Sequence, residues 1–412
     1  MNENNDNNNN NNINNNASNE SFIFDKFGSM DIIVIFFIIP LKIIILLLLK
    51  LVQSSYILLY DVNEVIPFEK KPYHNILFSK KYINDINVQS LNLLKYDSYS
   101  FYSLDNTFTI FKSSSEIFYI IYADINKSLI TFNLDVNKKI NEIKNAHNEY
   151  ISNIRYYLDS NIKRDLIMSL SAKDNNLKLW DFKILECILN LKDVNLDGEL
   201  YSACLLNDNN QNYIITSKYF WINVTYENIK IFDLKGNKIK EINDSDDNTY
   251  FIDSYYDEHL SKNYIITGNE GYTKSYDYST NTLYFMYVDI DSYGENRSMI
   301  INKYEGITEL IESNMDGKIR IWNFHSGELL NKIEISENWL YGLILWDDEY
   351  ILVGCSDKTI KVINLKDLKI IKNIIGYSEF VLTIKKIVHP IYGKCLISQG
   401  YGNEGITFIK NI

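Results

Sequence analysis

One short segment recurs seven times between residue 128 and the C-terminus, and it limits what this 412-residue chain can fold into. Each copy places apolar residues at alternate positions, as in NLKLWDF at 176–182, which is the pattern of a β-strand. The copies lie 41 to 52 residues apart when they are aligned on one anchor position. The anchors are Phe132, Trp180, Phe232, Tyr276, Trp322, Ile363 and Ile409. A repeat of roughly 40 to 50 residues built from several short strands is typical of a β-propeller blade.

A polar position at a fixed distance supports the same repeat. Five of the seven residues that stand six positions before an anchor are Asn or Asp, and the other two are Tyr226 and Glu270. Asn and Asp suit tight turns because their side chains bond to nearby backbone and tolerate unusual φ angles. Each unit is therefore predicted to contain a strand, a polar turn and a strand ending at the anchor, with one face of that strand buried.

The fold class that follows is all-β, a seven-bladed β-propeller. The composition agrees with it, because 32 Tyr and 20 Phe favour pleated sheets and only 4 Pro interrupt them. Strands at 107–112, 117–122 and 129–132 are assigned to the first blade. Because the chain ends within the third strand of the last blade, we expect an N-terminal strand, at 90–96 or 101–104, to close that blade and cover its edge.

Several short motifs resemble the WD-repeat family from about residue 110 onward. Trp180 and Asp181 match the dipeptide that names the family, and Trp322 with Asn323 is a near match. The segment 376–381, GYSEFV, resembles the Gly-His-containing entry to a first strand, and His147 follows Ala146 in a similar context. The resemblance implies a propeller that is not an enzyme and that binds other proteins.

The resemblance also implies a structural set within a blade, in which His, Ser or Thr, Asp and Trp are hydrogen-bonded. The blade around Trp180 can hold the whole set, with either Ser169 or Ser171 as its hydroxyl. Other blades keep only parts of this set, and the residues that they keep are also expected to have structural roles. The predicted structural residues are His147, Ser169, Ser171, Asp174, Trp180, Ser313, Asp316, Trp322 and Asp357.

Aromatic residues at the start of the innermost strands are the candidate interaction site. They are Tyr150, Tyr250, Trp339 and Phe380. The family geometry places this position near one mouth of the ring, and Tyr and Trp are enriched in binding hot spots. The alternative is that these side chains pack between neighbouring blades.

Charge and motif content exclude several functions. The net charge is −12 and no run of Lys or Arg exceeds a pair, whereas proteins that bind nucleic acid carry a basic face, so no nucleic-acid partner is expected. The GxGxxG at 400–405 precedes a strand rather than a helix, so we interpret it as a turn. The four cysteines, which are expected to be reduced and buried, and the five histidines are scattered. No metal, cofactor or catalytic residue is predicted.

Two segments precede the repeats. Residues 1–31 form an Asn-rich tail that is predicted to be disordered. Residues 32–52 are apolar, and Ile32 to Leu49 is a candidate transmembrane helix because about 20 apolar residues cross a bilayer. The lysines that follow would place the propeller, residues 61–412, in the cytoplasm. Two alternatives for this apolar segment stay open: it is a buried apolar element, or it is an extension that is not part of the working protein.

These observations favour an interaction scaffold or adaptor whose partners are proteins, tethered to a membrane if Ile32 to Leu49 spans one. Two other hypotheses stay open. The central channel could serve an enzyme or a small-molecule binder, which requires polar residues converging from several blades. The propeller could also bind a lipid surface directly.

Overall fold

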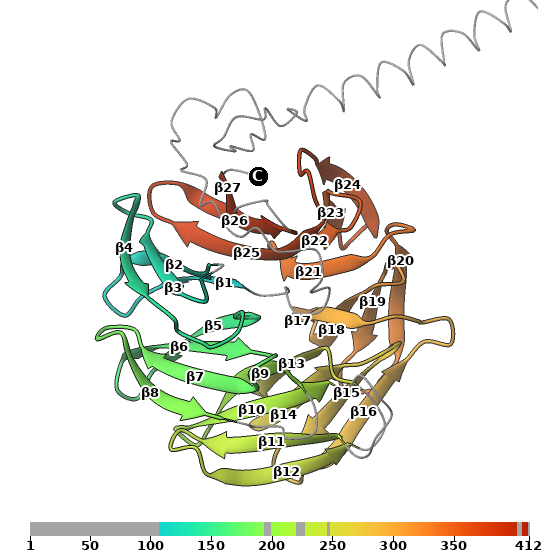
Figure 1. Ribbon diagram of the computed structural model, residues 1–412. Coiled ribbons are helices and arrows are strands. Elements are labelled where there is room, and N and C mark those ends of the chain that lie inside the picture. The colour runs from blue at the N-terminus through green and yellow to red at the C-terminus, as the bar shows by residue number, and fades with distance from the viewer. Residues whose placement is uncertain are drawn as a thin grey trace, which may run out of the picture. The chain divides into compact units, whose positions relative to one another are not determined.

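The computed structural model describes residues 107–410, except for 125, 193–198, 220–226, 245–247 and 402–405. The described residues form seven antiparallel sheets that follow one another around a ring, as a seven-bladed propeller (Figure 1). Six sheets have four strands, and the last has three within the described part of the chain. The predicted closing strands at 90–96 and 101–104, and the segment boundaries at residues 31, 52 and 61, lie outside the described residues.

Each blade is numbered by its order in the chain. Blade 1 holds β1 (Phe108–Lys112), β2 (Phe118–Ala123), β3 (Leu129–Asn133) and β4 (Lys138–Ile143). Blade 2 holds β5 (Asn153–Asp159), β6 (Arg164–Ser171), β7 (Asn176–Asp181) and β8 (Glu186–Leu191). Blade 3 holds β9 (Glu199–Asp208), β10 (Gln211–Tyr219), β11 (Glu227–Asp233) and β12 (Lys238–Asp244). Blade 4 holds β13 (Phe251–Asp257), β14 (Lys262–Gly268), β15 (Tyr272–Asp277) and β16 (Thr282–Val288).

The remaining blades repeat the same order. Blade 5 holds β17 (Asn296–Tyr304), β18 (Ile307–Asn314), β19 (Lys318–Asn323) and β20 (Leu329–Glu334). Blade 6 holds β21 (Leu340–Leu345), β22 (Tyr350–Cys355), β23 (Ile360–Asn364) and β24 (Lys369–Ile374). Blade 7 holds β25 (Val381–His389), β26 (Gly393–Gly400) and β27 (Ile406–Lys410). The three strands predicted for the first blade are therefore confirmed, as β1 to β3.

The position of a strand within its blade determines which of its faces is buried. First strands line the centre of the ring and are half-buried there, as in β5. Second strands are buried on both faces, and β2 is buried along its whole length. Fourth strands form the outer rim, where β4 is almost fully exposed. The second strand β2, FYIIYA, accordingly has apolar residues without alternation, while the fourth strand β4, KKINEI, is rich in charge.

The prediction that each third strand buries only one face is wrong. The residues between its apolar positions, two places before the anchor, are also buried in several blades, including Ile130, Lys274, Arg320 and Lys361. The reason is that a neighbouring blade covers each face, so both sets of alternate side chains lie between sheets. Arg320 is accommodated because its guanidinium donates to Asp289 over 2.8 Å and to Asp316 over 2.6 Å.

Each repeated anchor follows an irregularity in the sheet. In blades 1 to 6 the pairing of the third strand with the fourth shifts register directly before the anchor, as between Leu179 and Trp180. The residue after the anchor is Asp or Asn, and its side chain accepts backbone N–H groups of the turn that follows. Asp181, for example, accepts from Lys183 over 2.9 Å and from Ile184 over 3.3 Å. The repeated dipeptide thus combines a buried anchor with a turn cap.

These turns also require a residue with positive φ. It is Asn137, Leu185, Gly236, Asn281, Gly327 and Leu368 in blades 1 to 6, in that order. Asn and Gly adopt this conformation readily, whereas leucine places its Cβ close to the following carbonyl oxygen. Leu185 and Leu368 are therefore the two strained positions of this set.

The ring closes between blade 7 and blade 1 through a shared apolar core. Phe108, Phe118 and Ile120 of blade 1 pack with Cys395 and Ile397 of blade 7. Polar contacts accompany the core. The His389 Nε2 atom lies 2.9 Å from the Asp135 carboxylate, and the Thr107 hydroxyl donates to the Gln399 side-chain oxygen over 2.7 Å. The ends of the repeat array therefore bury each other's apolar faces.

The positive φ at Leu185, which is 58°, gives a first prediction. Leu185→Asn is expected to raise the free energy of unfolding by about 0.5–1 kcal/mol, because Asn tolerates this conformation and Leu185 belongs to none of the apolar core clusters. Equilibrium unfolding in urea measures the change. Ile184→Asn, at an exposed position of the same turn without positive φ, is the control and should change stability by less than about 0.5 kcal/mol. A loss of stability in Leu185→Asn would contradict the strain at this turn.

Candidate functional site

The structural set predicted for blade 2 is brought together around one hydroxyl. The Trp180 indole N–H donates to the Ser169 hydroxyl over 2.8 Å, and the His147 Nε2 atom lies 2.8 Å from the same oxygen. The His147 Nδ1 atom lies 3.7 Å from the Asp174 carboxylate. Ser169 is thus the hydroxyl of the set, and Ser171, although buried, bonds to neither ring. Burial lowers the pKa of His147 despite the opposing effect of Asp174, so the imidazole stays neutral.

Other blades fill the equivalent space with different groups. In blade 5 the Ser313 hydroxyl donates to the Tyr341 carbonyl of blade 6 over 2.7 Å, and Asp316 pairs with Arg320 beside the buried Trp322. In blade 6 Asp357 accepts from the Thr359 hydroxyl over 2.6 Å. In blade 7 the Tyr377 hydroxyl takes the place of a histidine, 2.5 Å from Ser398. These residues hold strands and blades together, and apart from Tyr341 none of them lines the central cavity.

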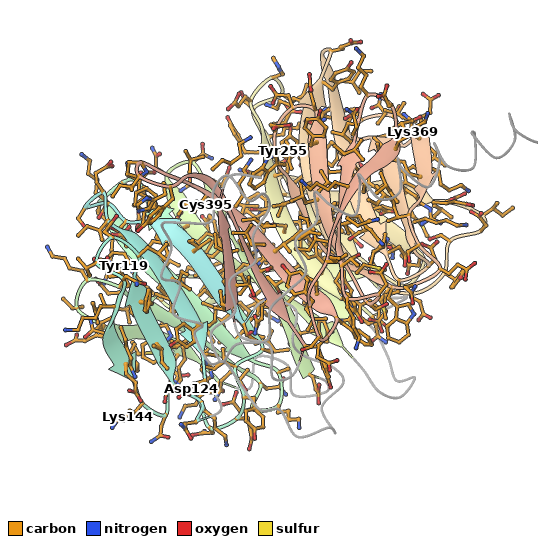
Figure 2. The ribbon with its side chains drawn as sticks, turned by 90° about the horizontal axis from the view of Figure 1, so that it is seen from above. Tyr119, Asp124, Lys144, Tyr255, Lys369 and Cys395 are labelled. Atoms are coloured by element: carbon orange, nitrogen blue, oxygen red, sulfur yellow. The ribbon has the colours of Figure 1, made fainter. Side chains whose placement is uncertain are left out.

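The propeller has two faces that differ in which turns they carry. The hairpin face carries the turns that join the first strand of each blade to the second, and the connection face carries the turns between the second and third strands. The segments between blades also lie on the connection face. Figure 2 shows this for blade 1, where Asp124 and Lys144 lie at one end of the blade and Tyr119 lies farther from that end. The aromatic residues singled out from the sequence stand directly before or near first strands, on the connection face.

The four aromatic residues do not form one exposed ring. Tyr250 is only 7% exposed, because it packs edge-on against Tyr201 and under the Arg297 guanidinium. Its burial rules it out as a docking residue. Trp339 is 42% exposed and is the most accessible of the four. Phe380 is half-buried beside Tyr401, and Tyr150 is half-buried near the Lys127 ammonium.

The hairpin face exposes apolar side chains that sequence reasoning missed. They are 38% to 74% exposed and come from four blades: Leu158 and Ile162, Tyr256 and Leu260, Tyr304 and Ile307, and Val388 and Ile391. Blades 4 and 5 are neighbours, so two of the pairs lie next to each other. The signal in the sequence is Leu158 and Tyr256, which occupy the same place in two seven-residue strands of identical burial pattern. Exposed apolar groups that gather on one face are typical of protein-binding surfaces.

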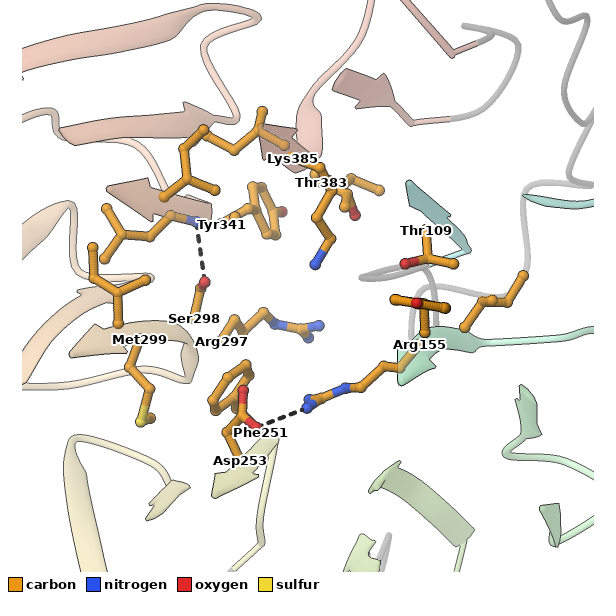
Figure 3. Close-up of a pocket in the computed structure, with 18 of the residues that line it drawn as sticks. Thr109, Arg155, Phe251, Asp253, Arg297, Ser298, Met299, Tyr341, Thr383 and Lys385 are labelled. Carbon is orange, nitrogen blue, oxygen red and sulfur yellow. Dashed lines mark hydrogen bonds and ion pairs between the residues drawn. The ribbon is translucent and has the colours of Figure 1, made fainter. Parts of the chain in front are cut away.

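The first strands surround a central cavity of about 370 Å³. Figure 3 shows Arg155, Arg297 and Lys385 reaching into it from three different blades. Asp253 lies in the same wall, and its carboxylate pairs with the Arg155 guanidinium at 3.2 Å. In the sequence the arginines are isolated and give no indication of a common site. Alignment of the first strands could have found them, because Arg155 and Asp253 both stand third in strands of the same length.

Three of the four cysteines are buried. Cys204, Cys355 and Cys395 are buried and free, but Cys187 is exposed because it lies on the outer strand β8. The prediction of four buried thiols is therefore wrong for Cys187.

Within the described ranges, no helix is long and apolar enough to cross a membrane. The candidate span, Ile32 to Leu49, lies outside those ranges, as do the glycines at 402 and 405.

Comparisons with known proteins add one distant similarity. No family model matches the chain. A stretch of 70 residues is 22% identical to the U3 small nucleolar RNA-associated protein 21 homolog of Schizosaccharomyces pombe. That stretch covers 17% of this chain and 8% of the relative. A match of this length is compatible with a shared repeat unit and shows neither the family nor the activity of the chain.

The Ser169 hydroxyl gives a prediction for blade 2. Ser169→Ala removes the partner of both Trp180 and His147, and two unsatisfied buried groups are expected to lower the free energy of unfolding by about 2–3 kcal/mol. Urea unfolding followed by tryptophan fluorescence measures this. Ser171→Ala, also fully buried in the same strand, is the matched control and should cost less than about 1 kcal/mol. Equal losses in the two variants would show that the hydrogen-bonded set does not stabilise the blade.

Proposed function

We propose that this chain is a non-catalytic scaffold or adaptor that binds protein partners through the hairpin face of a divergent WD-repeat propeller. The observation that carries the proposal is the exposure of apolar side chains at the first hairpin of blades 2, 4, 5 and 7. Leaving such groups in water is unfavourable, and covering them with a partner removes apolar area from solvent. The corresponding hairpins of blades 1, 3 and 6 are polar, which gives the face a pattern that a partner can recognise.

Membership of the WD-repeat family is part of the proposal. It is supported by the contacts of Ser169 with Trp180 and His147, and by the Asp or Asn cap that follows each anchor in blades 1 to 6. These contacts give a physical reason for the Trp-Asp dipeptide, since the ring is held inside the blade and the carboxylate holds the adjoining turn.

Protein partners suit this surface better than nucleic acid. The distant relative is named for its association with a small nucleolar RNA, so an assembly that contains RNA is one setting for the scaffold. Direct contact with an RNA backbone would require clustered cations on an accessible face, whereas the chain carries a net charge of −12. We therefore propose that any such association runs through another protein.

The hairpin face can be tested with two exposed tyrosines. Tyr256→Ser combined with Tyr304→Ser should reduce recovery of partner proteins at least tenfold when the full-length chain is immunoprecipitated from its native cells and quantified by mass spectrometry, because aromatic side chains supply much of the energy of an interface. Tyr293→Ser, at a position 67% exposed in the segment between blades 4 and 5, is the matched control and should keep the partners.

Trp339→Ala distinguishes the two faces of the ring. Loss of partners in this variant, with full recovery in the double tyrosine variant, would move the binding surface to the connection face and contradict the proposal. Circular dichroism of each purified variant verifies that the blades remain folded.

We further propose that Ile32 to Leu49 tethers the propeller to a membrane, with the propeller in the cytoplasm. The proposal is supported by the sequence alone: the apolar length of the segment and the lysines that follow it. The full-length chain should then remain with membranes after extraction with alkaline carbonate, and deletion of 32–49 should release it. Recovery of the full-length chain in the soluble fraction would overturn the tether without affecting the hairpin face.

A further inference from the structure

The central cavity collects positive charge from blades that are distant in the sequence. Arg155 comes from β5, Arg297 from β17 and Lys385 from β25, and their side chains point toward one another across the ring (Figure 3). Asp253 of β13 is the acidic residue in the wall. Neither the scaffold role nor the hairpin face makes use of this arrangement.

The two arginines are held in place by the protein. Arg155 pairs with Asp253 and donates to the Ile252 carbonyl over 2.7 Å. Arg297 donates to Glu295 over 2.6 Å and to the Tyr201 hydroxyl over 2.8 Å, and its guanidinium lies over the Tyr201 ring. Such contacts fix the direction of both guanidinium groups, each of which carries five N–H donors.

Lys385 differs from the two arginines. Its side chain is half-buried, and within the described part of the chain it makes neither a hydrogen bond nor an ion pair. Burial, together with the smaller effect of the Arg155 charge, lowers the pKa of Lys385 to about 8, although Asp253 has the opposite effect. The charged groups that face it across the cavity are thus Arg155, Asp253 and Arg297. The tyrosines of the same wall are Tyr156, Tyr157 and Tyr341.

Among the described residues, the balance of these charges leaves the Lys385 ammonium without a counter-ion. Asp253 compensates Arg155 and Glu295 compensates Arg297, so the charge of Lys385 remains unneutralised in a partly enclosed space. A positive charge in such a space is unfavourable by itself and becomes favourable when an anion occupies the cavity. Because the three cations approach from different sides, a tetrahedral group with oxygens in several directions can meet all of them, whereas a planar carboxylate presents its oxygens in one plane.

We propose that the central cavity is a binding site for a small ligand bearing a phosphate group, with Lys385 as its main ionic partner and Arg155 and Arg297 as orienting donors. A volume of about 370 Å³ lies within the range of small-molecule sites, and walls supplied by six first strands favour a small ligand over a polypeptide. The site is independent of the hairpin face, so the phosphate ligand is a co-ligand or regulator of the scaffold.

Calorimetric titration of the full-length chain with pyrophosphate tests the proposal. We expect saturable binding of one molecule per chain, and Lys385→Met is expected to weaken the affinity at least tenfold. Lys369→Met, at an exposed position of the outer strand β24, removes the same charge from the rim and should leave the affinity unchanged. The absence of binding to the folded wild-type chain, or equal binding by Lys385→Met, would overturn the proposal. Equal weakening in Lys385→Met and Lys369→Met would show that only the overall charge of the chain matters, and would also overturn the proposal.

Thermal unfolding provides a readout that does not depend on pyrophosphate. Because the ammonium of Lys385 is unfavourable in the empty cavity, Lys385→Met should unfold at a higher temperature than the wild type in buffer free of phosphate and sulfate. This difference should be largest below pH 8 and shrink as the pH rises from about 8, where the folded-state lysine loses its proton, toward 10.5, where the unfolded-state lysine loses it as well. Sulfate, which does not titrate in this range, should raise the unfolding temperature of the wild type more at pH 7 than at pH 9.5. If sulfate stabilised Lys385→Met as much as the wild type, or stabilised the wild type equally at both pH values, the proposed site would be contradicted.

Discussion

The structure depends on the mutual burial of neighbouring blades. Second and third strands bury the side chains of both faces, and each face is covered by the adjoining sheet. A single four-stranded sheet with two apolar faces cannot remain stable in water, so each blade requires a neighbour on both sides. Only a ring meets this requirement for every blade. The core that joins Phe118 and Ile120 of blade 1 to Ile397 of blade 7 is therefore the contact that converts a row of repeats into a closed molecule.

The same constraint determines where binding can occur. Side chains between blades are committed to packing, including the hydrogen-bonded set around Ser169, and carry no binding role. What remains accessible is the inner side of the first strands and the turns on the two faces. The cationic cavity lies at the inner side of the first strands, and the exposed pairs such as Tyr256 and Leu260 lie at the turns. Because the framework is rigid, both sites are held in fixed positions without contributions from long loops.

Much of this architecture can be predicted from the sequence, because the repeat spacing reflects local geometry. The anchors and their capping Asp or Asn are governed by residues a few positions apart, and the strands of blade 1 follow from simple alternation. Burial on both faces of the third strands could not be predicted in this way, since it depends on the neighbouring blade. The same holds for Tyr250, which is covered by Tyr201 and Arg297, and for the convergence of Arg155 with Lys385. A sequence presents such residues as isolated, and only ring closure brings them together.

Hydrogen exchange measured by mass spectrometry, at a urea concentration just below the unfolding midpoint, tests the closed ring most directly. If every blade depends on its neighbours, peptides from the second strands β2, β6, β14, β18, β22 and β26 should lose protection in one concerted step with the same rate. An open stack of repeats behaves differently, because its terminal units fray first. Earlier exchange in β2 of blade 1 and β26 of blade 7, with the other blades still protected, would show that the two ends do not stabilise each other and would contradict the account.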